Sequence, residues 1–325
     1  MPEPMHIRRR ASIPAVLLLV LSGLAAWAGE PPPALRVVDH PLAGRIWRPA
    51  DRAFVSPDDL AAAASGADAV LLGETHDNPG HHLLQAWMVR RLANAGRRPV
   101  VAFEMLDVAQ GERANAYLAA HPGDAAGLGE AVGWDATGWP EWSQYRPIAE
   151  AALAVGAPVA AASLARDTTR ALAKGGAPAE LVAALGLDRP LAPAVQAGME
   201  AEIRDDHCGM LPESAIAAMV VVQRARDAWM ARVVTEGMAR QGAAVLIAGA
   251  GHVRADRGVP ARLDAIAPGR KVVALAFLEV EDGVDDPAEY GEALGAALPP
   301  YDFVWFTPRA EREDPCEKWR RKAGK

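Results

Sequence analysis

Four residues of the sequence combine carboxylate and imidazole chemistry: Glu74, His76, Glu104 and His252. Carboxylate oxygen and imidazole nitrogen suit a divalent transition metal such as Zn, Mn or Fe, which can activate a bound water molecule. The same groups can also act as general acid and base without a metal. The chain contains neither H-E-x-x-H nor G-x-S-x-G, so neither a metzincin nor an α/β-hydrolase is indicated. The G-A-G before His252 lacks the spacing of a dinucleotide site.

Each of these residues comes directly after an apolar run of strand length. Such runs occupy about residues 69–72, 100–103, 158–162, 243–248, 271–278 and 303–306. Continuously apolar strands that alternate with helices indicate an α/β fold, a mostly parallel sheet flanked by helices. Folds of this kind place their ligands at the carboxyl ends of the strands. We therefore expect the four residues to meet at one sheet edge, together with Arg166, which follows the third strand.

Helix signals fill the intervals between the runs. A Ser-Pro-Asp-Asp start predicts a helix over 56–65, with the serine as N-cap. A second helix is expected from 79 to about 96, and a long one from 212 to about 240. The long helix places Gln223 and Asp227 on one face, because residues four apart lie one above the other.

The helix-only stretches are expected to form a smaller lobe beside the sheet. We assign the parallel-sheet core to about residues 35–105, 157–166 and 243–308, and the helical lobe to about 106–156 and 167–241.

Structural roles are the alternatives for several of these residues. Glu74 can cap the following helix, and His76 or His252 can be satisfied core histidines. His81 and His82 open a predicted helix, and we expect at least one of them to face solvent. His40, His121 and His207 have no motif of their own; the first two are expected at the surface, and the third lies beside a cysteine near a helix end.

The first 28 residues resemble an export signal. A basic stretch at 8–10 precedes an apolar stretch at 15–26, and Ala26-Trp27-Ala28 matches an A-x-A cleavage site. Cleavage after Ala28 gives a periplasmic or secreted protein. An uncleaved anchor is the less favoured alternative, because the apolar stretch is shorter than the roughly 20 residues of a spanning helix.

Charge and cysteine content narrow the partners and the compartment. Removing residues 1–28 removes three Arg and one Glu and takes the formal net charge from −7 to −9, which disfavours nucleic acid and anionic membrane as partners. The two cysteines, Cys208 and Cys316, can form a disulfide in an exported protein. Two unpaired thiols are the alternative.

An aromatic segment at 133–147 indicates a different ligand. It contains Trp134, Trp139, Trp142 and Tyr145, and such a cluster can face a flat apolar molecule. Packing of a helical core is the common alternative. The Tyr145 phenolate is also a possible axial ligand of ferric haem.

Together these motifs resemble the ChaN family, the haem-binding uptake branch of the Tiki superfamily. The resemblance rests on G-E-T-H-D-N-P-G-H-H-L-L-Q at 73–85, F-E-M at 103–105, the W-D/G-W-P/W/Y-R-P run, Q-R-A-R-D-A-W-M-A at 223–231 and G-A-G-H-V-R-A-D-R-G-V-P at 249–260. It extends over nearly the whole mature chain, which makes residues 29–325 one ChaN-like domain. The chain has no lipobox cysteine, so the lipid anchor of many ChaN-type proteins is not expected here.

The resemblance implies haem binding linked to iron acquisition, with haems at a homodimer contact bound through Tyr and His. We take Tyr145 and His207 as the candidate haem ligands, with Arg166 and Arg254 as further cofactor-binding residues. More distant relatives are Tiki metalloproteases and erythromycin-esterase-like hydrolases. For them the shared element corresponds to Glu74 and His76.

Two functional hypotheses follow from the sequence. The first is an exported haem-binding protein of iron acquisition, with no stable membrane span once the signal is removed. The second is a metal-dependent hydrolase of peptide, ester or amide bonds, in which Glu74, His76, Glu104 and His252 bind the metal and its water.

Overall fold

The computed structural model describes residues 31–32, 39–314, 316–317 and 320–321. The predicted signal peptide, residues 1–28, lies outside these residues. Within them, no helix has both the length and the apolar character needed to cross a membrane.

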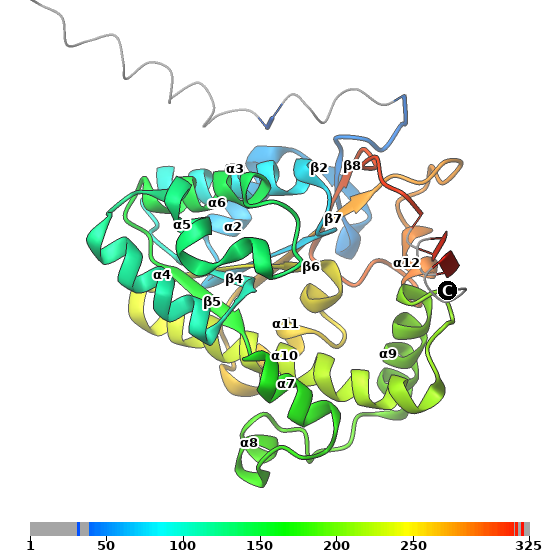
Figure 1. Cartoon of the computed structure of the whole chain (residues 1–325). Helices are drawn as coiled ribbons and strands as arrows, with labels where there is room; N and C mark the ends of the chain where they lie inside the picture. Colours follow the sequence, from blue (N-terminus) through cyan, green and yellow to red (C-terminus); the bar gives the residue numbers. More distant parts are fainter. Residues whose placement is uncertain (1–30, 33–38, 315, 318–319, 322–325) are drawn as a thin grey trace, which may run out of the picture.

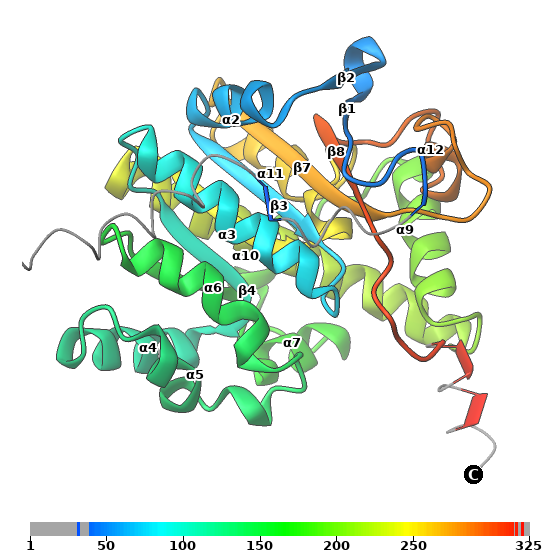
Figure 2. The ribbon, with the colours of Figure 1, turned by 90° about the horizontal axis from the view of Figure 1, so that it is seen from above.

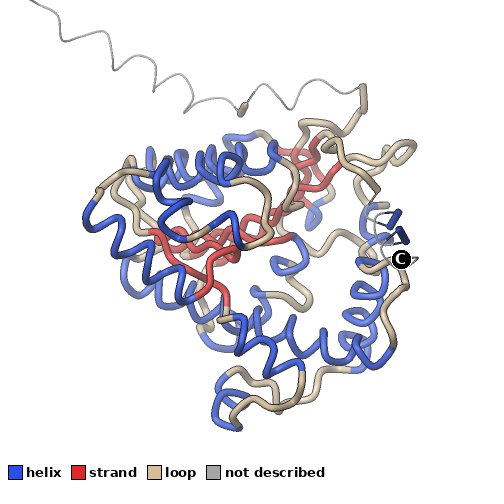
Figure 3. Tube along the Cα trace, in the orientation of Figure 1, coloured by secondary structure: helices blue, strands red, loops and turns tan. Residues whose placement is uncertain are grey.

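A single mixed sheet runs through the middle of the molecule (Figures 1 and 3). In the described part of the chain it has eight strands in the order β2-β1-β8-β7-β3-β6-β4-β5. The strands are β1 (Ile46–Arg48), β2 (Ala53–Val55), β3 (Ala69–Glu74), β4 (Val100–Asp107), β5 (Val159–Ser163), β6 (Ala244–Gly249), β7 (Val272–Glu279) and β8 (Phe303–Thr307). Strands β3 to β8 pair in parallel, whereas β1 is antiparallel to both β8 and β2. The predicted α/β class with a mostly parallel sheet is confirmed.

One face of the sheet is covered by helices from the first half of the chain (Figure 1). These are α2 (Pro57–Ser65), α3 (Pro79–Asn94), α4 (Val108–Ala120), α5 (Ala125–Val132) and α6 (Trp142–Leu153). Trp87 of α3 and Ile148 of α6 are fully buried in one core with Val70 and Phe103 of the strands. Residues 106–156, assigned from the sequence to a separate lobe, thus share the core of the sheet.

The opposite face is covered by the second half of the long helix α10 (Glu213–Gln241) and by α11 (Val259–Ile266). Met230 and Val234 of α10 pack with Leu71 and Leu246, which alternate with the strand residues of the first core. Both faces of the sheet are therefore covered by helices and buried, which explains why the strand sequences are continuously apolar.

The first half of α10 extends beyond the sheet and carries a smaller group of helices (Figures 1 and 2). This outer group contains α7 (Arg166–Ala173), α8 (Ala179–Ala184) and α9 (Pro193–Asp206), while the short α12 (Tyr290–Ala293) lies next to β7 and β8. Leu172 and Leu185 contact Ala225 in one small cluster, and a second cluster joins α9 to the start of α10. The helix α10 thus connects the sheet to the outer helices.

Two strands continue two or more residues further than the sequence indicated, and each extension contains a buried acid. Strand β3 continues to Glu74, and β4 continues through Glu104 to Asp107. Since an unpaired charge is rarely buried, each acid was expected just after its strand. A register shift between β4 and β5 after Phe103 lets β4 continue past Glu104.

The two cysteines are bonded to each other. The Cys208–Cys316 disulfide joins the turn between α9 and α10 to the C-terminal segment, 108 residues further along the chain. The predicted pairing is confirmed.

Candidate functional site

Glu74 is the centre of the first half of the site. Its side chain is fully buried at the end of β3, and the Tyr145 hydroxyl of α6 donates a 2.8 Å hydrogen bond to its Oε1. His76 Nδ1 lies 2.8 Å from the same oxygen. On the other side, His82 Nε2 lies 3.3 Å from Oε2 without hydrogen-bond geometry. One carboxylate therefore has two imidazoles and a phenol around it.

Glu104 is the centre of the second half. The Gly249 amide donates a 2.7 Å hydrogen bond to Oε2, and Arg226 of α10 donates to Oε1. His252 Nε2 lies 3.3 Å from Oε1. His76 Nε2 approaches Oε2 to 3.9 Å and so lies between the two acids. The four residues predicted to meet at the carboxyl edge of the sheet do meet there.

Helix α10 supplies further members that complete the second half. Asp227 Oδ1 lies 2.6 Å from His252 Nδ1, and both side chains are almost fully buried. Gln223 Nε2 lies 3.2 Å from the same imidazole nitrogen. Asp227 thus orients His252 toward Glu104, and Gln223 of the same helix face lies beside the ring.

The charge states follow from these contacts. Burial alone would raise the pKa of Glu74, but His82 and His76 lower it to about 2. Burial would likewise lower the pKa of His252, whereas Glu104 and Asp227 raise it to about 9. The pKa of Glu104 lies well below its ordinary value because His252 and Arg226 outweigh burial. At neutral pH the edge carries ionised carboxylates beside a protonated His252.

The raised pKa of His252 predicts an alkaline loss of stability. In the unfolded chain a histidine titrates near 6.5, and in the fold this one titrates near 9. Its contribution is therefore complete below about pH 6.5 and is lost as the pH rises through 9. We expect the thermal midpoint to fall between these pH values, and to fall less steeply in His252→Gln, measured by calorimetry in matched buffers. Equal slopes in the two proteins would contradict the assignment.

A hollow of about 190 Å³ opens beside Glu104. Its lining combines apolar and polar side chains, among them Met105, Trp139, Leu164 and Arg166. The Trp139 ring lies against His76, with ring centroids 4.6 Å apart. Arg166 is exposed and donates a 2.9 Å hydrogen bond to the Thr137 carbonyl at the rim. The hollow thus offers the flat ring of Trp139, which lies against His76, and the Arg166 cation at its rim.

The chain is similar to known proteins in its sequence family and in its fold. A family model described as haem-binding uptake, Tiki superfamily, ChaN matches residues 60–263. The chain belongs to this ChaN family. Membership confirms the resemblance seen in the motifs, and with it a haem-binding function in iron acquisition. No curated protein sequence matches the chain.

One solved structure shares the fold, and two others are less similar. ChaN of Campylobacter jejuni, described with cofacial haem binding, superposes with a TM-score of 0.61 at 19% identity, covering 80% of this chain and 95% of that one. The type III effector HopBA1 gives a TM-score of 0.43 at 16% identity, over 84% of this chain and 100% of that one. The erythromycin esterase EreC gives 0.37 at 16% identity, over 82% of each chain.

Tyr145, a candidate haem ligand of this ChaN-family chain, lies inside the protein. Its ring is fully buried and its hydroxyl is bonded to Glu74 and, at 3.2 Å, to the His76 carbonyl. Burial and the neighbouring Glu74 raise its pKa far above the ordinary value. A phenolate ligand would have to break these contacts, because phenol is the form that the site stabilises. The aromatic run around it, including Trp134 and Trp142, belongs to the core.

The other predicted cofactor residues lie in different places. His207 is half-buried in the turn after α9, with Nδ1 2.8 Å from the Ile203 carbonyl. Arg254 is buried and bonded to Asp256 through two nitrogens. Of the predicted haem-binding set, Arg166 lies at the hollow.

The prediction that His81 or His82 faces solvent is wrong, because both side chains are fully buried. His81 lies between the Thr75 amide and the Thr307 hydroxyl, and His82 lies against the Tyr145 ring, with centroids 4.1 Å apart. Both side chains are buried because the first turn of α3 lies against the sheet, where Thr307 and Glu74 are their neighbours.

Four members of the site were not predicted to be functional: His82, Gln223, Arg226 and Asp227. Each lies in a motif that carried the family resemblance, His82 in the stretch 73–85 and the other three in Q-R-A-R-D-A-W-M-A at 223–231. The motifs do not show which residues these side chains contact, since His82 faces Glu74 across the loop between β3 and α3 and the other three reach the sheet edge from α10.

The residues do not fit a protein-bound metal. Among the described residues, no three His, Cys, Asp or Glu side chains are arranged to hold a metal ion. The physical reason is that the central groups already pair with one another: Glu104 is bonded to Arg226, and His252 Nε2, the nitrogen that Asp227 leaves free, lies 3.3 Å from Glu104 Oε1. The predicted set Glu74, His76, Glu104 and His252 forms an ion-pair network.

Proposed function

We propose that this protein is exported, binds haem at the hollow beside Trp139, and passes it on for iron acquisition. The observation that carries the proposal is the ChaN family match, which includes every residue of the network and the hollow. Export rests on the N-terminal signal pattern. A mature protein whose mass begins at Gly29 would agree with it.

His76 is the residue at this edge that we assign to the haem iron. Its side chain is 32% exposed, whereas those of His82 and His252 are 0% and 6% exposed. The Glu74 carboxylate is hydrogen-bonded to His76 Nδ1. Carboxylate–histidine pairs of this kind orient metal-binding imidazoles and raise their basicity. An added methyl group at Gly249 would lie 2.9 Å from Nε2, so any larger residue at this position would crowd the imidazole.

The surroundings of His76 suit the rest of the haem. Trp139 offers an aromatic face to a porphyrin, and the exposed Arg166 guanidinium can pair with a propionate carboxylate. When bound, haem supplies the iron and its redox chemistry. The protein residues supply an axial nitrogen, an apolar contact and a cation.

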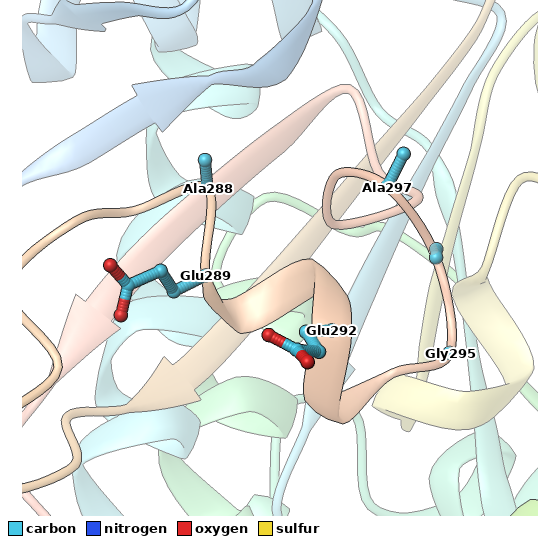
Figure 4. Close-up of a pocket in the computed structure, with 6 residues that line it drawn as sticks. Ala288, Glu289, Glu292, Gly295 and Ala297 are labelled. Carbon is cyan, nitrogen blue, oxygen red and sulfur yellow. The ribbon is translucent and has the colours of Figure 1, made fainter.

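A second hollow is less suitable. It is the larger of the two, about 540 Å³, and lies beside α12 between Ala288 and Ala297 (Figure 4). Its polar lining consists of Glu289 and Glu292. These carboxylates would repel haem propionates, and the lining contains no His, Tyr, Cys or Met, the side chains that usually bind haem iron.

The size of the first hollow supports a dimer. At about 190 Å³ it is smaller than the roughly 300–1,000 Å³ of pockets that enclose drug-sized ligands, so it can take only one side of a porphyrin. The other side requires a cover, and we propose a second copy of the chain in that role. Haem-dependent dimerisation in sedimentation experiments would support this.

Hemin titration tests the proposal. We expect a saturable Soret change with a defined stoichiometry. His76→Ala should lose affinity by about 100-fold or more, because loss of an outer-shell partner of a metal ligand alone costs roughly 10–100-fold. His121→Ala is the matched control, since this histidine is exposed and stacks on Tyr117 away from the network. Absence of a saturable change in the wild-type protein would overturn the proposal.

A further inference from the structure

The loop between β3 and α3 presents His76, and a segment from the far end of the chain holds this loop. We call residues 307–314 the C-terminal strap. Figure 2 shows the chain leaving β8 and running past α9 toward the C-terminus. The contacts between strap and loop occur at three places.

The first contact passes through the buried His81. The Thr75 amide donates a 2.9 Å hydrogen bond to His81 Nδ1, and His81 Nε2 lies 2.8 Å from Thr307 Oγ1. Because a backbone N–H can only donate, Nδ1 is the acceptor and the proton is on Nε2. Burial lowers the pKa of His81 to about 3, so the ring is neutral. Thr307 therefore fixes the residue directly before His76 through one imidazole.

The second and third contacts surround Glu279, at the end of β7, which binds residues of both the loop and the strap. Asn78 donates to Glu279 Oε1 at 2.7 Å and to the Pro308 carbonyl at 3.1 Å. Arg312 binds both oxygens of Glu279 and donates through Nε to Asp77 Oδ2 at 2.9 Å. The two residues that follow His76 are thus bonded to the strap or to its partner.

The end of the strap is fixed by a covalent bond. The Cys316 amide donates a 2.8 Å hydrogen bond to Asp314, and Cys316 is bonded to Cys208 between α9 and α10. The strap is therefore continuous with β8 at one end and tied to the outer helices at the other.

We propose that the C-terminal strap positions His76, with Thr307 and Arg312 as positioning residues and the Cys208–Cys316 disulfide as its anchor. For the identity of the ligand at His76 this inference rests on the proposed function. The strap does not contact haem itself. It determines whether the His76 imidazole is presented in one orientation.

Thr307→Val and Thr307→Ser form a matched pair that tests the inference. Valine keeps the volume but leaves the His81 Nε2 proton without an acceptor, whereas serine keeps the hydroxyl. Three quantities are measured in each folded protein: amide hydrogen exchange at Thr75, the NMR signal of the His76 Nδ1 proton bonded to Glu74, and the rate of haem release to apomyoglobin.

We expect Thr307→Val to accelerate Thr75 exchange and haem release about tenfold, the factor that one lost buried hydrogen bond gives. The His76 proton signal should broaden, and Thr307→Ser should behave as the wild type. Reduction of the disulfide, or Arg312→Ala, should act in the same direction as valine.

The exchange and NMR measurements need no haem, so they separate the two proposals. If the wild type binds no haem but valine loosens Thr75 and His76, the proposed function fails and the strap stands. If valine leaves exchange and the His76 signal unchanged, the strap inference is overturned. It is also overturned if the loop loosens while the haem release rate stays the same.

Discussion

Glu104→Gln is expected to lower the free energy of unfolding by about 3 kcal/mol, the lower end of the range for breaking a buried ion pair. Glu104 is 1% exposed and is the acceptor for Arg226 and the Gly249 amide, with His252 3.3 Å away. Glutamine conserves the volume and one acceptor oxygen, so the loss reports the missing charge. The cations would then lie in a low-dielectric region with less compensation.

Urea denaturation at pH 7 measures this loss. Glu150→Gln is the control, because its pair with Arg146 at 3.0 Å is about half exposed on both sides, and exposed pairs contribute from 0 to about 1 kcal/mol. A loss for Glu104→Gln no larger than that of the control would mean that the network is not an ionised one. High salt should weaken the control effect more than the Glu104 effect.

Removing the disulfide is the second large change. Cys208→Ser with Cys316→Ser opens a loop of 108 residues. In the chain-entropy model the loss is about 4 to 5 kcal/mol, because the unfolded chain regains the freedom of that loop. We expect the urea midpoint of the double variant to fall accordingly and to be insensitive to dithiothreitol, whereas the wild-type midpoint should fall on reduction.

A wild-type midpoint that is unaffected by full reduction would contradict this prediction, provided that mass spectrometry shows both thiols. The single variants serve as controls for the serine substitutions. Each leaves one free thiol, so they should resemble the double variant in stability. The two single variants differ in one respect. Cys208 has a positive φ of 58°, and serine at this position would adopt the same unfavourable backbone conformation.

The sequence could predict the sheet edge because its signals were local. Apolar runs mark buried strands whatever their partners are, and the first polar residues after them fall at one edge in any parallel sheet. This is why Glu74, Glu104 and His252 were placed together although 178 positions separate the first from the last. The N-cap at Ser56, also local, is present as expected, and Asp59 completes a capping box with it.

The rest of the site depends on tertiary contacts that no local pattern contains. Tyr145 was expected to be a ligand because it lies in an aromatic run, but the α3–α6 packing turns its hydroxyl toward Glu74. His81 and His82 were expected near solvent because a helix start is usually exposed. Their partners, Thr307 and Glu74, lie at the ends of strands β8 and β3. The buried acids were expected outside the strands because their cationic partners, His76 and His82 for Glu74 and Arg226 and His252 for Glu104, are not visible in the strand sequences.

A crystal structure of the haem complex would show whether His76 binds the haem iron at the sheet edge. We expect iron bonded to His76 Nε2, the porphyrin against Trp139 and a propionate paired with Arg166. Iron bonded to Tyr145 or His207, or haem bound away from this hollow, would contradict it.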